Sequence, residues 1–283
     1  MNTIKSRPVS FVLVTLIYVI AIAVGVLCCE VLPFSIWLNV LLADVIATVV
    51  TFIFSLIFEN ASVYDPYWSV QPIVIVIGLA IVYGVNLSVL FAIIAVCIWG
   101  VRLTANWAYT FYGLTHQDWR YTMLCEKTGK FYPIINFVGI HMVPTLVVYF
   151  ATLPLIVIIS SQVQFNPWCL IGFIISIMAV ILQGTADVQM HKYKKNRTTL
   201  FIRVGLWKYS RHPNYLGEIL MWWGVGIFAV ALMPDKWWLL TGAIINTLLF
   251  TFVSIPMAEK KQSKKDGYSE YKMQTRVLFP IKK

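Results

Sequence analysis

Residues 9–29 read VSFVLVTLIYVIAIAVGVLCC, a run without a charged side chain. About 20 consecutive apolar residues in a helix are enough to span the hydrocarbon core of a bilayer. Lys5 and Arg7 precede the run, but it is longer than a signal-peptide core and no small-residue cleavage site follows it. We therefore expect a first membrane span that is retained in the protein.

The rest of the chain repeats this apolar pattern. The runs do not alternate polar with apolar residues, which favours helices over barrel strands. The third run, 70–83, is short, so it forms either a full span or a half-span that leaves seven full ones. Pro144 and Pro154 predict a kink or a late start in the fifth. The apolar segments lie at about 9–29, 37–58, 70–83, 87–107, 135–159, 168–189, 214–233 and 237–257.

Composition indicates the same fold class, an all-α polytopic membrane bundle of seven or eight transmembrane helices. The chain is 59% hydrophobic and 12% charged, with a mean hydropathy of +0.78, whereas soluble domains usually carry about twice that charged fraction. No internal repeat or linker stands out, so we expect a single domain, 1–283. The sequence has no glycine-rich dinucleotide fingerprint, P-loop, metalloprotease motif or zinc motif. We therefore expect no metal, and any nucleotide would be held by helices and basic loops.

The basic residues lie on one side of the expected membrane. With the N-terminus inside, the inside segments hold 20 of the 22 Lys and Arg residues. This asymmetry follows the positive-inside rule, so the net charge of +10 marks inner loops and nucleic acid is not an expected partner. We expect a multi-pass protein of the bacterial inner membrane, or of the endoplasmic reticulum in a eukaryote, with its active site toward the cytoplasm. The inside segments are 1–8, 59–69, 108–134, 190–213 and 258–283.

The stretch KYSRHPNYLGE at 208–218 carries the strongest chemical signal. Pro213 suits the first turn of a helix, because its missing N–H would be unpaired there anyway. Arg211 and His212 would then lie at the mouth of this helix, where the helix N-terminus adds a partial positive charge. This arrangement predicts an anion-binding mouth at the inner membrane surface.

The same helix is expected to carry a polar row. Asn214, Glu218 and Trp222 recur every four residues and share one face. An ionisable side chain one turn inside a span is costly, so Glu218 is a functional candidate by default. The alternative is a glutamate that pairs with a neighbouring arginine for packing alone. The row would present an amide and a carboxylate deeper in the membrane than the cationic mouth.

A second polar row precedes this helix. Gln183, Asp187 and His191 recur every four residues at the inner end of the sixth apolar segment. A carboxylate there could hold ribose hydroxyls while the following cations hold phosphates. The alternative for the cations is ordinary positive-inside charge. They are Lys192, Lys194, Lys195, Arg197 and Arg203.

Two weaker signals lie in the first half. In the loop HQDWRY at 116–121, Asp118 and Arg120 either pair locally or contact a ligand. Asp44 lies in the middle of the second apolar segment, where an ionisable side chain is expected to face the bundle interior. The sequence assigns it no partner.

The stretch VYDPYWS at 63–69 lies at a membrane entry. Asp65 with Tyr64 and Tyr67 could polarise a substrate carbonyl or donate a proton. The two tyrosines could equally form part of an interfacial aromatic belt. The residues alone do not separate these two interpretations.

The stretch RHPNYLGE at 211–218 resembles the steroid 5-alpha-reductase family, and is most similar to its broad microbial branch, whose substrates are mostly unassigned. The resemblance is strong from about 180 to 281 and weaker before 60. The other matching elements are Asp187, GLWKYS at 205–210, IPMAEK at 255–260, GYSEY at 267–271, Phe279-Pro280, WGVRL at 99–103 and DWRY at 118–121.

The resemblance implies a seven-span helical fold that binds NADPH from the cytosolic side and reduces a conjugated carbon–carbon double bond of a lipid or steroid-like substrate. Carried over by motif, Asn214 would contact the nicotinamide end and Glu218 would lie beside the reacting centre. Asp187, with Gln183 one turn earlier, would bind the adenosine portion. The cofactor-binding half would be about 180–283. The remaining implied cofactor contacts are His191, Lys194, Arg197, Arg203, Tyr209, Arg211, His212, Tyr215, Arg120 and Lys260.

The first half departs from the steroid enzymes, which hold the 3-oxo group with a Glu and a Tyr. Asp65 stands near the expected Glu, and Trp99 stands where the Tyr is expected. Either Tyr64 or Tyr67 takes the tyrosine's role, or the substrate is not a 3-oxo steroid. The catalytic candidates are therefore Glu218, Asp65, Tyr64 and Tyr67.

The rival interpretation is a membrane methyltransferase of the isoprenylcysteine or phospholipid type. Such proteins share Arg-His-Pro, Tyr and Gly in the same helix and use S-adenosylmethionine. Asn214, Glu218, Asp187 and the 118–121 loop favour the reductase. A non-enzymatic lipid-binding or structural membrane protein is the third interpretation, and the lack of repeat symmetry disfavours a transporter.

Overall fold

The computed structural model describes residues 6–197 and 199–280, and within them eight helical stretches are long and apolar enough to cross a membrane. They coincide with the eight apolar segments, so the third segment is long enough for a full span and need not be a half-span. Here helix α3 (Tyr67–Tyr83) follows a short 3-10 turn, η1 (Ala61–Tyr64), in one stretch of 23 residues. Gly84 ends α3 at a φ of 90°, which glycine adopts without steric cost.

The described residues contain no β-strand, only a single bridge between Ser210 and Arg276. This confirms the predicted all-α polytopic bundle. Within it the chain divides into two compact units, Met1–Gln162 and Val163–Lys283. The predicted cofactor-binding half, about 180–283, falls inside the second unit.

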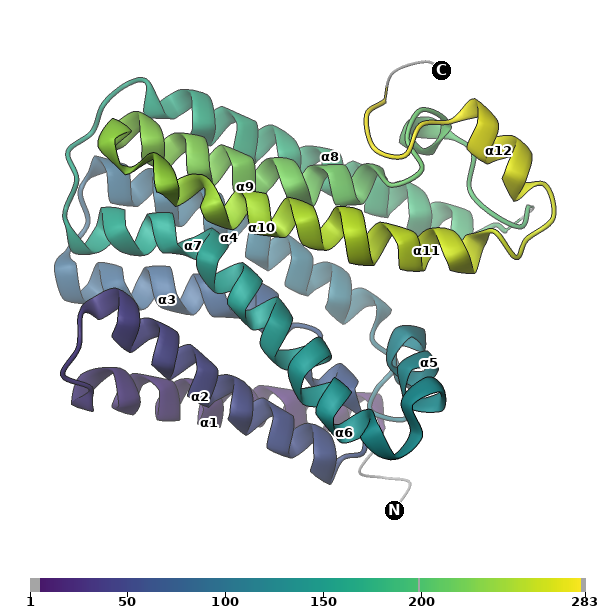
Figure 1. Cartoon of the computed structure of the whole chain (residues 1–283), viewed down its shortest axis with the longest axis horizontal. Coiled ribbons are helices and arrows are strands. Elements are labelled where there is room, and N and C mark those ends of the chain that lie inside the picture. Colours follow the sequence, from purple (N-terminus) through teal and green to yellow (C-terminus); the bar gives the residue numbers. More distant parts are fainter. Residues whose placement is uncertain (1–5, 198, 281–283) are drawn as a thin grey trace. The chain divides into compact units, whose positions relative to one another are not determined.

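The first unit begins with two helices that lie side by side (Figure 1). Asn39 closes the turn between them, because its Nδ2 donates to the Leu32 carbonyl at 2.7 Å and its Oδ1 accepts from the Phe34 N–H at 3.1 Å. Helix α3 packs against α4 and α7. The helices of this unit, besides α3, are α1 (Arg7–Val31), α2 (Ile36–Ile57), α4 (Leu87–Thr110), α5 (Trp119–Thr128), α6 (Tyr132–Ile135) and α7 (Val143–Ser160).

The fifth apolar segment contains a break in regular α-helical geometry. A 3-10 turn (Gly129–Phe131) and α6 lead into a π-helical segment, η3 (Asn136–Met142), and α7 starts directly after it. Pro144 lies in the first turn of α7, which agrees with the late start that this proline predicts. Pro154 lies inside α7 without ending it. A π-helical segment often marks a functional position in a helix.

The second unit is built around α8 (Cys169–Lys195) and α9 (Pro213–Leu232), which lie side by side (Figure 1). Small residues allow the close approach: a Cβ on Gly172 would meet the backbone of Phe228, and one on Gly224 would meet Ser176. The remaining elements are η4 (Gly205–Lys208), η5 (Pro234–Leu240), α10 (Thr241–Leu249), the π-helical η6 (Phe250–Ser254), α11 (Ile255–Gln262) and α12 (Tyr268–Gln274).

The C-terminal segment attaches to the residues just before α9. The Arg211 N–H donates to the Arg276 carbonyl at 2.9 Å, and the His212 N–H donates to the Val277 carbonyl at 3.1 Å. The Trp207 indole donates to the Ala186 carbonyl of α8 at 3.2 Å. The entry to α9 is therefore fixed by both α8 and the chain end, which gives its side chains defined positions.

Candidate functional site

A buried carboxylate lies near the start of α9. Pro213 is the first residue of this helix, as predicted, and Glu218 lies one turn further in with 4% of its surface exposed. Trp222, one more turn along, donates from Nε1 to Glu218 Oε1 at 2.8 Å. Gln183 of α8 donates from Nε2 to Glu218 Oε2 at 2.5 Å. The two predicted polar rows therefore meet at Glu218, which has a donor on each oxygen.

Gly217 allows the Gln183 side chain to reach Glu218. A Cβ on Gly217 would collide with Cγ of Gln183 and would lie 2.8 Å from the Ala179 carbonyl oxygen. Without that Cβ, the Gln183 side chain can lie flat against α9 and bring its amide to Glu218. Gly217 is thus a residue of the site that the spacing of polar side chains did not reveal.

Asn214 lies one turn before Glu218 on the same face of α9. Its Oδ1 is buried and has no hydrogen-bond partner among residues 6–197 and 199–280. A buried acceptor without a partner costs on the order of 1–3 kcal/mol. An amide or hydroxyl donor of a bound molecule would satisfy it.

Arg211 and His212 contact an acidic residue that the sequence interpretation left without a role, Glu259 of α11. Arg211 donates from Nε to Oε1 at 2.9 Å and from Nη2 to Oε2 at 3.1 Å. His212 Nε2 and the Tyr268 hydroxyl lie 2.8 Å and 2.7 Å from Glu259 Oε1. Burial and the hydrogen bond to Glu259 raise the pKa of the Tyr268 phenol, so this hydroxyl remains a donor at neutral pH.

The same guanidinium also binds the chain end. Arg211 Nη1 donates to the carbonyls of Lys272 and Thr275, the first at 3.2 Å. The geometry therefore assigns Arg211 and His212 to bracing the tail against the start of α9. Their predicted contact with phosphates remains a prediction. The signal for Glu259 was present in the IPMAEK stretch, which the sequence interpretation used only as part of a resemblance.

The other predicted cofactor residues of the second unit divide into two groups. Asp187 is half-buried on α8 and His191 follows it by one turn, on the side chain row that begins at Gln183. Lys194, at the end of α8, and Lys260, near the end of α11, are exposed. Asp187 and His191 thus extend the polar row of α8 beyond Gln183, which binds Glu218. Lys194 and Lys260 lie at the basic ends of their helices.

The remaining members of that set contact aromatic rings or backbone. The Arg203 guanidinium lies 4.3 Å from the Phe201 ring and donates to the Gly267 carbonyl at 3.1 Å. Tyr215 stacks on His212 with ring centroids 5.2 Å apart. The last two predicted contacts are exposed, Arg197 beside the Thr199 carbonyl and Tyr209 beside Lys208.

In the first unit, the stretch at 63–69 is buried. Tyr64 and Tyr67 are 1% and 6% exposed, which excludes the alternative of a lipid-facing aromatic belt for these two. The Tyr64 hydroxyl lies 2.8 Å from Thr145 Oγ1. Asp65 accepts a hydrogen bond from the Tyr121 hydroxyl at 2.7 Å.

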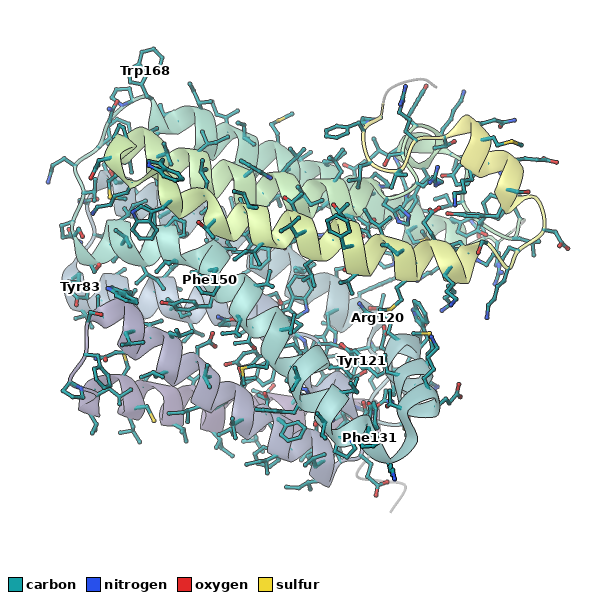
Figure 2. The ribbon with its side chains drawn as sticks, in the orientation of Figure 1. Tyr83, Arg120, Tyr121, Phe131, Phe150 and Trp168 are labelled. Atoms are coloured by element: carbon teal, nitrogen blue, oxygen red, sulfur yellow. The ribbon has the colours of Figure 1, made fainter. Side chains whose placement is uncertain are left out.

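Arg120 pairs locally, one of the two outcomes that its loop predicted. It donates from Nε and Nη2 to the two carboxylate oxygens of Asp118 at 2.8 and 3.2 Å. Figure 2 shows Arg120 and Tyr121 at one end of the first unit and Tyr83 at the other. A possible contact of Arg120 with a cofactor stays a prediction.

The sequence interpretation missed a histidine on the π-helical segment. His141 is fully buried, and its ring lies 4.7 Å from that of Tyr64. Its Nδ1 lies 3.0 Å from the Asn136 carbonyl, while its Nε2 has no hydrogen-bond partner in the described part of the chain. A lone histidine in an apolar run gives no periodic signal, so only the structure reveals this position.

Asp44 faces the interior of the first unit, as predicted, and the structure supplies its partners. Its Oδ1 accepts from the Tyr67 hydroxyl at 2.9 Å and its Oδ2 accepts from Nε2 of Gln71. The three residues lie at the wall of a partly open cavity of about 380 Å³ that α1, α2 and α3 line. Within the described residues no cluster of three or more metal-ligating side chains occurs.

These features define a polytopic helical membrane protein that concentrates buried polar groups at the start of one span. A family model described as "Protein of unknown function (DUF1295)" matches residues 51–275. The chain belongs to this family, which is a steroid 5-alpha-reductase-like membrane family. The resemblance found in the sequence is thereby confirmed at the level of the family.

One curated relative is similar to this chain. The Uncharacterized protein C594.04c of Schizosaccharomyces pombe is 23% identical over 199 residues, which cover 60% of this chain and 58% of that protein. The chain thus spans less than two thirds of the length of this relative. No solved structure matches the chain.

Proposed function

We propose that this protein is an NADPH-dependent membrane oxidoreductase that reduces a conjugated carbon–carbon double bond of a lipid or steroid-like substrate. The observation that carries the proposal is the buried carboxylate of Glu218, held by Gln183 and Trp222 one turn from the buried acceptor of Asn214. Membership of a steroid 5-alpha-reductase-like family supports it.

The residues present suit a dinucleotide. Oδ1 of Asn214 offers an acceptor to an amide N–H, such as that of a nicotinamide carboxamide. Asp187, one turn after Gln183 on the neighbouring helix α8, offers carboxylate oxygens to ribose hydroxyls. The cations Lys194, Arg197 and Lys260 are suited to phosphates, because they are exposed and positively charged.

When bound, NADPH supplies a hydride. The role of this chain is to bind the nicotinamide end at Asn214 and to keep Glu218 in one orientation through its two donors. Hydride addition to a double bond that is conjugated to a carbonyl builds negative charge on the carbonyl oxygen, which a hydroxyl donor stabilises, and a proton from a side chain or water would then complete the reduction at the α-carbon. The catalytic roles of Tyr64, Tyr67 and Asp65 in the first unit stay predictions, and the Tyr67 hydroxyl is already engaged there, since it donates to Asp44.

The test is a thermal unfolding measurement on the purified protein with NADPH or with S-adenosylmethionine. We expect stabilisation by NADPH, of about 2.7 kcal/mol at a hundredfold excess over Kd. The stabilisation should be lost in a variant that combines Asp187→Ala with Asn214→Ala. Asp235→Asn is the matched control, because this exposed residue follows the opposite end of α9.

Any other result of the thermal unfolding measurement would point to a different function or a different cofactor site. Stabilisation by S-adenosylmethionine alone would replace the proposal by the methyltransferase of the isoprenylcysteine or phospholipid type. No response to either cofactor would favour a lipid-binding protein without enzymatic activity. Stabilisation by NADPH that persists in the double variant would place the cofactor elsewhere.

A further inference from the structure

The cavity in the first unit has the form of a ligand site. Its volume of about 380 Å³ lies within the range of roughly 300–1,000 Å³ that is typical of small-molecule pockets. Three helices line it, and most of the lining is aliphatic, including Ile22, Val40, Ile75 and Leu79. Such a lining suits a hydrocarbon chain.

The cavity is elongated along α3. Gln71 and Val82 both line it, and their separation along a helix corresponds to about 16 Å. Tyr67, Gln71 and Asp44 mark one end, while Glu30 and Val82, near the ends of α1 and α3, mark the other. With the orientation that the basic loops predict, the second end faces the outer leaflet.

The polar end of the cavity presents a hydrogen-bond acceptor that has no partner among the described residues. The Tyr67 hydroxyl and the Gln71 amide both donate to Asp44, so each carboxyl oxygen already accepts one hydrogen bond. Oε1 of Gln71 is buried and has no partner in residues 6–197 and 199–280, and the residue as a whole is 6% exposed. A ligand that satisfies this acceptor has to bring an O–H or N–H group.

We propose that this cavity binds a long-chain lipid alcohol, with the hydroxyl on Gln71 Oε1 and the chain extending toward Val82. A hydroxyl both donates and accepts, so it can also accept the second N–H of the same amide. A neutral hydroxyl costs far less to bury among aliphatic side chains than an ammonium group does. The inference concerns binding by the first unit and is independent of the reaction proposed for the second.

The structure offers a variant that fills the cavity without disturbing the fold. A Cβ on Gly78 would meet nothing within 4 Å, and this helical residue lines the cavity. Gly78→Leu should therefore occupy the space of the ligand. Gly139→Leu adds the same side chain at an exposed position whose nearest neighbour is the Ile135 side chain at 3.9 Å, so it is the matched control.

The experiment is photo-crosslinking of the full chain in phosphatidylcholine nanodiscs with a diazirine-bearing dodecanol, followed by peptide mapping. We expect crosslinks within α1, α2 and α3 that disappear in Gly78→Leu and persist in Gly139→Leu. Unlabelled dodecanol should compete at about tenfold lower concentration than dodecyl methyl ether, which has the same chain but no donor. In Gln71→Met the two competitors should become equivalent.

Two results would overturn the inference. Crosslinks that lie outside these three helices, or that survive Gly78→Leu, would show that the cavity does not hold the probe. Equal competition by the ether, or stronger competition by dodecylamine, would show that a hydroxyl is not the recognised group. Because the readout needs no cofactor, it does not depend on the result of the NADPH experiment.

Discussion

Arg211, in the segment before α9, forms a two-point ion pair with Glu259 of α11, with N–O distances of 2.9 and 3.1 Å. The two side chains are 4% and 12% exposed, so the pair is largely removed from water. The same guanidinium binds the carbonyls of Lys272 and Thr275. This one side chain therefore joins the entry of α9, the end of α11 and the chain end.

Loss of the charge on Glu259 should destabilise the second unit. Glu259→Gln leaves a buried guanidinium without its counter-charge, and breaking such a pair costs on the order of 3 kcal/mol. We expect a lower unfolding temperature and earlier proteolytic cleavage of the chain end. Lys260→Gln, at the exposed neighbouring position, is the control and should behave like the wild type.

A conservative change of Arg211 tests the same ion pair from its other side. Arg211→Lys keeps the positive charge but cannot make the two-point contact or reach both tail carbonyls. It should therefore destabilise the protein nearly as much as Glu259→Gln. Wild-type stability in both variants would show that the pair does not hold the tail.

A methyl group on Gly217 should disturb the contact between α8 and α9. In Gly217→Ala the added Cβ collides with Gln183 and approaches the Ala179 carbonyl, so either the helices separate or Gln183 leaves Glu218. Overpacking of this kind costs about 1–3 kcal/mol. Unfolding measurements should show that loss, whereas Gly78→Ala, which has open space, should be neutral or slightly stabilising. A Gly217→Ala protein as stable as Gly78→Ala would contradict the packing.

If the proposed reduction is correct, Glu218→Gln should separate binding from turnover. The amide keeps an oxygen for one of the two donors, so the fold and the stabilisation by NADPH should persist. The consumption of NADPH with lipids that carry a conjugated carbonyl should fall by a factor of about 10²–10⁴. Glu270→Gln, exposed on α12, is the control. Full turnover in Glu218→Gln would remove this carboxylate from the catalytic set.

Alkaline pH should destabilise the C-terminal segment. Burial raises the pKa of the Tyr268 and Tyr271 phenols above their ordinary value of about 10. The folded state holds these protons more tightly, so the stability they contribute is present below about pH 10 and is lost as pH rises through the folded-state pKa.

The measurement is the unfolding temperature between about pH 8 and pH 11. In a variant that combines Tyr268→Phe with Tyr271→Phe, the decline above about pH 10 should be shallower than in the wild type. Met273→Leu, an exposed change on the same helix, should keep the wild-type slope. Identical slopes in all three proteins would exclude a contribution from the two phenols.

The helical state and approximate positions of the apolar segments could be predicted from the sequence, although the third was left open as a full span or a half-span. Apolar runs of this length leave the backbone only one way to satisfy its hydrogen bonds in lipid, so each run becomes a helix wherever its neighbours lie. Pro213 opens α9 for an equally local reason, since it lacks the N–H that a first turn does not use. The four-residue spacing likewise placed Glu218 and Trp222 on one face, and their hydrogen bond follows from it.

The partners of these side chains were decided by the tertiary structure. Glu259 binds Arg211 across 48 positions, and Gln183 reaches Glu218 across 35 positions. The second contact depends on the close approach of α8 and α9 at Gly217. No local pattern encodes such an approach, since it depends on which small residues face each other once the helices pack. The spacing of polar residues in the sequence could therefore identify the candidate side chains. Helix packing determined which of them stabilise the fold and which remain available to a ligand.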